Sequence, residues 1–166
     1  MDIYLEVTKK KTIAVALNAL GFYRIGKSED EVLDSLLAYG KRYAAILNLG
    51  GIDFQPPTNL DDLNIVARYE GNATTAFGSP GIIPEEDKRK ITEQDRKRYE
   101  KFLHLCWKAF DKTVVYAEGK ELRKGPRGGG RNLEKIIQHV RESDLAYLRK
   151  QAQKVSKEER EDMHAI

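Results

Sequence analysis

Residues 2–17 read DIYLEVTKKKTIAVAL, and this stretch decides the fold. Apolar and polar side chains alternate over residues 3–7, and they alternate again over residues 12–19. A run of three lysines, residues 9–11, separates the two segments. Because a period of two is typical of strands, the stretch predicts two antiparallel strands joined by a charged turn.

The rest of the chain predicts three helices and one further strand. Ser28 begins a helix whose first turn is acidic and which ends at Gly50. Residues 63–69 predict the strand, and residues 22–25 are an extended or short strand segment. Thr92 caps a long helix that runs to about Glu118. Asn132 caps a last helix that runs to about Lys150. The predicted class is α+β, with a small antiparallel sheet (β-β-α-β) packed with two further long helices.

The domain organisation follows from this order. We expect residues 1–150 to form a single α+β domain. Residues 1–52 would form a β-β-α unit, and residues 60–150 a strand plus two helices. Residues 151–166 predict a frayed charged tail.

The composition limits the cellular compartment of the protein and the cofactors that it can bind. The chain has 166 residues, one cysteine and three histidines, and its net charge is +3. These counts exclude an internal disulfide framework and a multi-cysteine zinc site, so we expect no cofactor. No apolar run approaches the ~18 residues of a membrane span, and the N-terminus has no secretory signal pattern. We therefore expect a cytoplasmic protein without a membrane partner.

The positive charge is concentrated in residues 120–131, KELRKGPRGGGR. This stretch has five basic residues and one acid, a net charge of +4, so the other residues together carry −1. Glycine amides that lead into a helix start favour anions, and arginines grip phosphate or carboxylate with two bonds. The predicted anion site comprises Arg123, Lys124, Arg127, Gly128, Gly129, Gly130, Arg131 and Asn132. The alternative is a flexible basic connector between two helices.

A second glycine-rich stretch covers residues 71–84 and has no regular period. Its polar side chains can line a small-molecule pocket, and they are Asn72, Thr74, Thr75 and Ser79. The alternative, which we favour for the loop taken alone, is a surface loop packed through its apolar residues.

The last predicted helix places Asp144 within its apolar stripe. A carboxylate there needs a partner, so Asp144 predicts an ion pair, with Arg68, Arg123 or Arg131 as candidates. A backbone amide or a metal is the alternative partner, and His139 is a weak candidate ligand for a metal.

Two segments resemble known families. Residues 1–52 resemble the HicB-like antitoxin domain, through the two short strands, the segment LGFYRIG at residues 20–26 and the acidic helix start SEDE at residues 28–31. The last helix resembles a piece of the DinB family, through the spacing of His139 and Asp144, and this resemblance implies a metal-binding bundle. The whole chain is similar to a family of uncharacterised bacterial proteins that carry residues 71–75 and 120–131 together.

These observations lead to three functional hypotheses. The first is a non-catalytic protein that binds an anionic ligand, either nucleic acid or a phosphorylated small molecule, through the basic stretch. The second is a DinB-like metal-dependent enzyme with a pocket between the two glycine-rich stretches. The third is an oligomeric interaction module without ligand chemistry. Under each hypothesis the protein could form a homo-oligomer.

Overall fold

The computed structural model describes residues 1–123, 130–151, 153, 155, 156 and 159–161. The chain divides into two compact units, Met1–Leu105 and Cys106–Ile166. We call them the N-terminal and the C-terminal unit and describe each by itself. Compactness does not establish independent folding, so a single domain over residues 1–150 stays a prediction.

The N-terminal unit is built on a four-stranded sheet in the order β3-β2-β1-β4. Neighbouring strands β1, β2 and β3 are antiparallel, as predicted, whereas β4 is parallel to β1. The four strands are β1 (Asp2–Val7), β2 (Thr12–Ala16), β3 (Tyr23–Gly26) and β4 (Asn64–Glu70). The α+β class is confirmed, and the prediction of an antiparallel sheet is wrong for β4.

The direction of β4 follows from the helix that precedes it. Helix α1 (Glu29–Asn48) returns the chain along the sheet after β3, so β4 begins at the same end as β1. There the Asn64 backbone N–H donates to the Met1 carbonyl over 2.9 Å. The 3₁₀ turn η1 (Leu60–Asp62) lies directly before β4.

Helix α1 covers one face of the sheet. Its predicted cap is confirmed, because the Ser28 side chain accepts from the Glu31 backbone N–H over 3.2 Å. Alternate residues of β1 and β2 pack against its inner side and form the hydrophobic core, which contains Ile3, Leu5, Ala14, Ala16, Ala19, Phe22, Val32, Leu36, Tyr43 and Leu47.

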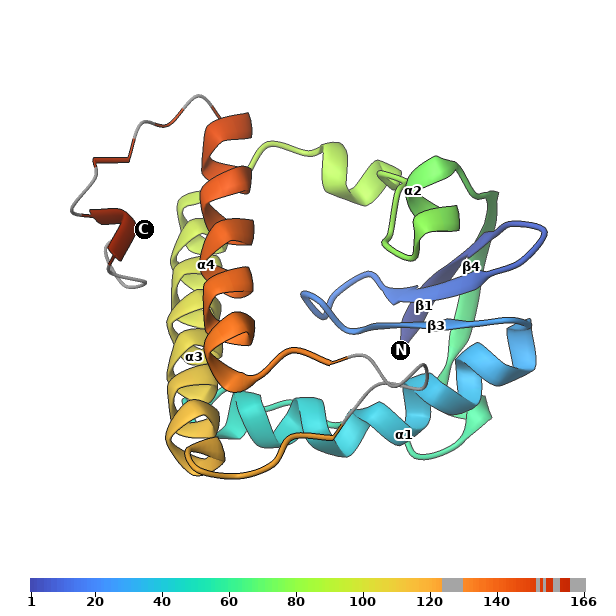
Figure 1. The fold of residues 1–166 in the computed structure, drawn as a ribbon. Helices are drawn as coiled ribbons and strands as arrows, with labels where there is room; N and C mark the ends of the chain where they lie inside the picture. The colour runs from blue at the N-terminus through green and yellow to red at the C-terminus, as the bar shows by residue number, and fades with distance from the viewer. Residues whose placement is uncertain (124–129, 152, 154, 157–158, 162–166) are drawn as a thin grey trace. The chain divides into compact units, whose positions relative to one another are not determined.

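The opposite face of the sheet is covered by the residues that follow β4. Figure 1 shows the sheet between α1 and the short helix α2 (Ala73–Phe77). This segment was predicted to have no regular structure. Helix α2 forms because Asn72 caps its first amides and Gly78 ends it in the left-handed conformation, with φ of 117°.

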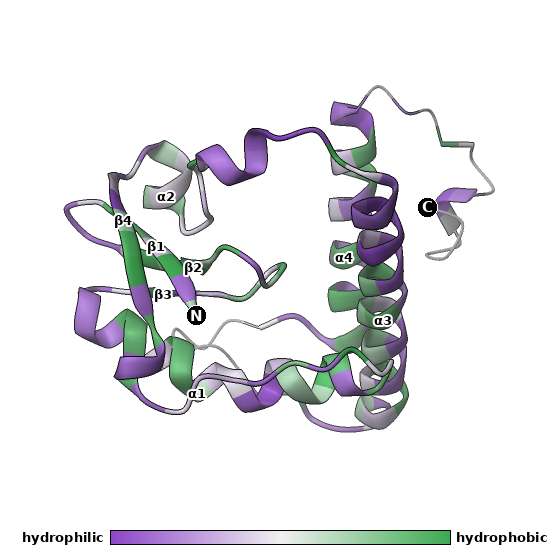
Figure 2. Ribbon diagram, turned by 180° about the vertical axis from the view of Figure 1, so that it is seen from behind, coloured by the Kyte–Doolittle hydropathy of each residue, from purple (hydrophilic) through white to green (hydrophobic). Residues whose placement is uncertain are grey.

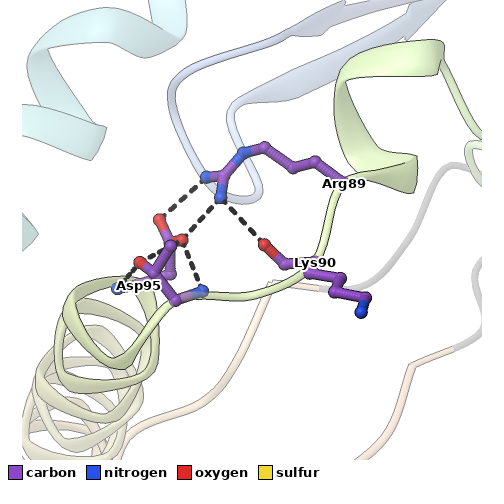
Figure 3. Close-up of polar contacts among 4 residues, drawn as sticks. Arg89, Lys90 and Asp95 are labelled. Carbon is purple, nitrogen blue, oxygen red and sulfur yellow. Dashed lines mark hydrogen bonds and ion pairs between the residues drawn. The ribbon is translucent and has the colours of Figure 1, made fainter.

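Helix α3 (Glu93–Ala117) begins in the N-terminal unit with a strong polar cap. Figure 3 shows Arg89 bridging both oxygens of Asp95, over 2.6 and 2.8 Å. Asp95 also accepts from the backbone N–H and the hydroxyl of Thr92, the predicted cap residue. The 3₁₀ turn η2 (Glu85–Lys88) precedes this clamp.

The C-terminal unit contains the second half of α3 and helix α4 (Leu133–Lys150), which lie side by side in both ribbon views. The predicted cap is confirmed, because the Asn132 side chain accepts from the Lys135 backbone N–H over 3.0 Å. Figure 2 shows hydrophobic and hydrophilic residues alternating around both helices. A 3₁₀ turn, η3 (Glu159–Glu161), lies beyond α4. Within the described part of the chain, no helix has the length and apolarity needed to cross a membrane.

Candidate functional site

A cavity of about 580 Å³ lies in the N-terminal unit, between three segments that are far apart in sequence. Residues 18–20, between β2 and β3, form one wall, and residues 51–54, after α1, form another. Tyr43 and Leu47 of α1 form the floor, and the first half of α3 closes the third side. We call this the aromatic cavity. Its volume falls within the ~300–1,000 Å³ of typical small-molecule sites.

Three aromatic rings line the cavity: Tyr43, Phe54 and Phe102. The Phe54 ring meets Tyr43 edge to face at 4.7 Å between centroids, and the Phe102 ring meets Tyr43 at 6.3 Å. Behind them Phe22 is fully buried and contacts both Tyr43 and Phe54. Tyr43 is also buried, whereas Phe54 and Phe102 are partly exposed, so the two phenylalanines keep free ring surface.

Three exposed cations of α3 also line the cavity: Lys97, Arg98 and Lys101. The acids nearby on this helix are already bound, since Asp95 pairs with Arg89, and Glu93 and Glu100 both pair with Arg96. Within the described part of the chain, neither Lys97 nor Lys101 has an ion pair. Like charges one helical turn apart repel each other, so this arrangement favours an anion beside them.

The loop of residues 18–20 is held from two sides. The Tyr43 hydroxyl donates to the Leu20 carbonyl over 2.7 Å. The Arg98 guanidinium donates to the Asn18 carbonyl over 3.2 Å. One bond ties the loop to α1 and the other ties it to α3, so both helices hold this wall of the cavity.

The lining supplies binding chemistry. It contains no histidine, cysteine, serine or threonine, the residue types that most often serve as nucleophile or general base. Its one carboxylate, Asp53, is exposed and accepts from the Gln55 side chain over 3.0 Å. Aromatic surface with a few convergent charges is typical of a ligand site.

Thr75 and Asn72, two of the residues predicted to line a pocket in the second glycine-rich stretch, form hydrogen bonds that hold this stretch together. The Thr75 hydroxyl donates to the carboxylate of Glu6, and both side chains are fully buried. The Gly81 and Ile82 backbone N–H groups donate to the same carboxylate over 2.9–3.0 Å. The Asn72 side chain accepts from the Thr74 and Thr75 amides and donates to the Gly81 carbonyl. The side chains of Asn72 and Thr75 therefore bind within the stretch and to Glu6.

A second hollow, more open than the aromatic cavity, lies beside the lysines at residues 9–11. Asn72, one of the four predicted pocket residues, lines it. Thr74 is exposed, Ser79 is partly exposed, and neither lines the aromatic cavity. An alanine at Gly81 would place its Cβ 2.3 Å from the Asn72 side-chain oxygen, so the stretch closes tightly on itself.

The predicted anion site lies in the C-terminal unit, and half of it lies outside the described residues. Lys124, Arg127, Gly128 and Gly129 are the residues not described. Arg123, Gly130, Arg131 and Asn132 are all exposed. The two glycine-rich stretches belong to different units, so a pocket shared by them stays a prediction.

Asp144 is partly buried on α4, and this burial raises the pKa of its carboxyl. It forms no ion pair with another described residue. Arg68, one of its candidate partners, instead pairs with Glu29 of α1 over 2.6 Å. His139 is exposed, and among the described residues no group of three His, Cys, Asp or Glu side chains could hold a metal ion. Burial also raises the pKa of the Cys106 thiol, which lowers its reactivity.

Comparison with protein-family models, with curated proteins and with solved structures finds no match to this chain. The resemblances to the HicB-like domain and to the DinB family therefore stay predictions.

Sequence reasoning did not identify the aromatic cavity. The available signal was the four-residue spacing of Lys97 and Lys101 and of Arg98 and Phe102. On a helix this spacing places cations and an aromatic ring on two neighbouring strips of the surface.

Proposed function

We propose that this protein binds a small organic anion in the aromatic cavity and does not transform it. The observation that carries the proposal is the combination of Lys97, Arg98 and Lys101 with the rings of Phe54 and Phe102 around one cavity. The rings remove apolar ligand surface from water, and the cations attract its charge.

The size of the cavity favours a small molecule over a polymer. A cavity of about 580 Å³, walled by three segments, matches a ligand of drug-like size. Nucleic-acid sites instead extend along a basic surface that follows the phosphate backbone. The cations of the aromatic cavity come from little more than one turn of α3.

Calorimetric titration of the full chain with phenyl phosphate tests the proposal. We expect saturable binding that weakens about fivefold or more when Lys97→Gln and Lys101→Gln are combined, because two exposed ion pairs of about 0.5 kcal/mol each contribute about 1 kcal/mol. Lys108→Gln is the matched control, since this exposed lysine of α3 does not line the cavity. The proposal fails if neither phenyl nor cyclohexyl phosphate binds, or if the double variant and the control behave alike.

A second candidate, nucleic-acid binding by the basic stretch of residues 120–131, is supported by its net charge of +4. We expect the full chain to retain single-stranded RNA at low salt and to lose it steeply as salt rises, because bound counterions are released. Arg127→Gln combined with Arg131→Gln should abolish retention. Unchanged retention in a folded double variant contradicts this candidate. Stoichiometric metal in the purified protein would instead favour the DinB-like alternative.

A further inference from the structure

We infer that the ligand of the aromatic cavity is an aromatic phosphate ester whose flat ring inserts between Phe54 and Phe102, above Tyr43. This inference rests on the proposed function and names the chemical class of its ligand. The observation that carries it is that two partly exposed phenylalanine rings line one cavity and make no ring contact with each other among the described residues.

Two of the three lining rings, Phe54 and Phe102, are partly exposed, and we call the space that they line the slot. Phe54 and Phe102 each contact Tyr43, at 4.7 and 6.3 Å between ring centroids. No contact joins Phe54 to Phe102 among the ring pairs of the described residues, although both line the same cavity. The two rings therefore contact the buried Tyr43 from different segments of the chain, and the partly exposed surfaces of both line the cavity.

A flat ring fits this slot better than an aliphatic group of equal size. Aromatic pairs prefer centroid distances of about 4.5–7 Å in offset or edge-to-face geometry, and each pair adds roughly 2- to 12-fold in affinity beyond the buried area. A ring in the slot gains such pairs with both phenylalanines at once. A cyclohexyl group buries similar area and gains neither.

The cations favour a phosphate on the ring. Lys97 and Lys101 lie one turn apart on α3, and Arg98 and Phe102 form the adjacent row with the same spacing. Arg98 and Phe102 lie four residues apart on α3, so a charge one bond from a ring beside Phe102 lies close to the Arg98 guanidinium. Three cations suit a phosphate monoester, which carries about −1.5 to −2 at neutral pH, better than a single carboxylate.

Calorimetric titrations of the full chain with phenyl phosphate, cyclohexyl phosphate and inorganic phosphate test the inference. We expect phenyl phosphate to bind at least about fivefold more tightly than cyclohexyl phosphate. This factor is the smallest gain in affinity expected when two aromatic pairs form. Inorganic phosphate should bind more weakly than either ester. Equal affinity of the two esters overturns the ring selectivity and leaves the proposed function standing, whereas absence of binding by both overturns the proposed function.

Substitution of the slot residues assigns the selectivity to these rings. Phe102→Leu and Phe54→Leu keep an apolar side chain and remove the ring, so each should lower the ratio of phenyl to cyclohexyl affinity at least about twofold. Phe77→Leu is the control, because Phe77 lies on α2, is 85% exposed and does not line the cavity. The ratio is measured within each variant, so a general loss of affinity does not alter it. An unchanged ratio in both slot variants refutes the insertion site.

Discussion

Replacing Thr75 by valine tests the role that the structure gives to the second glycine-rich stretch. The valine keeps the shape of threonine and removes a hydroxyl that makes two bonds. As a donor, the hydroxyl binds the buried Glu6 carboxylate, and as an acceptor it takes the Asn72 backbone N–H over 3.1 Å. Loss of a hydrogen bond to a buried charged group costs about 1.5–3 kcal/mol, and loss of the cap bond about 0.5–1 kcal/mol. We expect Thr75→Val to lower the free energy of unfolding by about 2–4 kcal/mol.

Two further variants separate the hydroxyl from other effects. Thr75→Ser keeps both bonds and loses one buried methyl group, which costs about 0.5–1.5 kcal/mol. Thr74→Val makes the same chemical change one residue earlier, where the side chain is exposed, and should stay within about 0.5 kcal/mol of the parent.

Urea denaturation followed by far-UV circular dichroism measures these differences. With a slope near 2 kcal/mol per molar urea, Thr75→Val should shift the midpoint by about 1–2 M at unchanged slope. The reasoning is refuted if Thr75→Val and Thr75→Ser have the same midpoint, because the hydroxyl would then contribute nothing to holding the stretch on the sheet.

Three further predictions concern single sites. Arg89 holds the pKa of Asp95 well below its usual range, so this pair contributes stability above about pH 4 that is lost as the pH falls through the lowered pKa. Between pH 5 and pH 2 the melting temperature should therefore fall less for Asp95→Asn than for the parent. Burial raises the pKa of Asp144, so its charge opposes folding at pH 7, and Asp144→Asn should raise the melting temperature there and raise it less at pH 4; a lower melting temperature at pH 7 would indicate an ion pair instead. Gly81→Ala places a Cβ 2.3 Å from the Asn72 side-chain oxygen and should cost about 1–3 kcal/mol in urea denaturation, and a neutral result would contradict the tight closure of the stretch.

Local sequence signals predicted most of the secondary structure. The caps Ser28, Thr92 and Asn132 each bind a backbone amide of the helix that follows. These signals depend on residues within one or two turns of one another, so they can be recognised without knowledge of the fold. The alternation of residues 3–7 likewise predicted β1 correctly.

Contacts between distant residues could not be predicted in this way. Alternation placed Glu6 on the side of the strand away from the helix, which suggests solvent. The structure buries it beneath Thr75 and Gly81, which are 69 and 75 residues away in sequence. The short helix α2 depends partly on that contact, because Thr75 belongs both to its cap and to the Glu6 site. The parallel direction of β4 is another long-range property, since it follows from the return path through α1.

The candidate site shows the same limit most clearly, because charge pairing is a tertiary property. The basic stretch of residues 120–131 attracts attention in the sequence, since five cations stand there with one acid. The first half of α3 mixes three acids with four bases, so its sequence does not stand out as basic. Only the structure shows that its acids are bound by Arg89 and Arg96, and that Lys97 and Lys101 are left beside aromatic rings from two other segments. Two helical faces of equal net charge can therefore differ in affinity for anions, because the charge that acts on a ligand is the charge that the protein has not already paired.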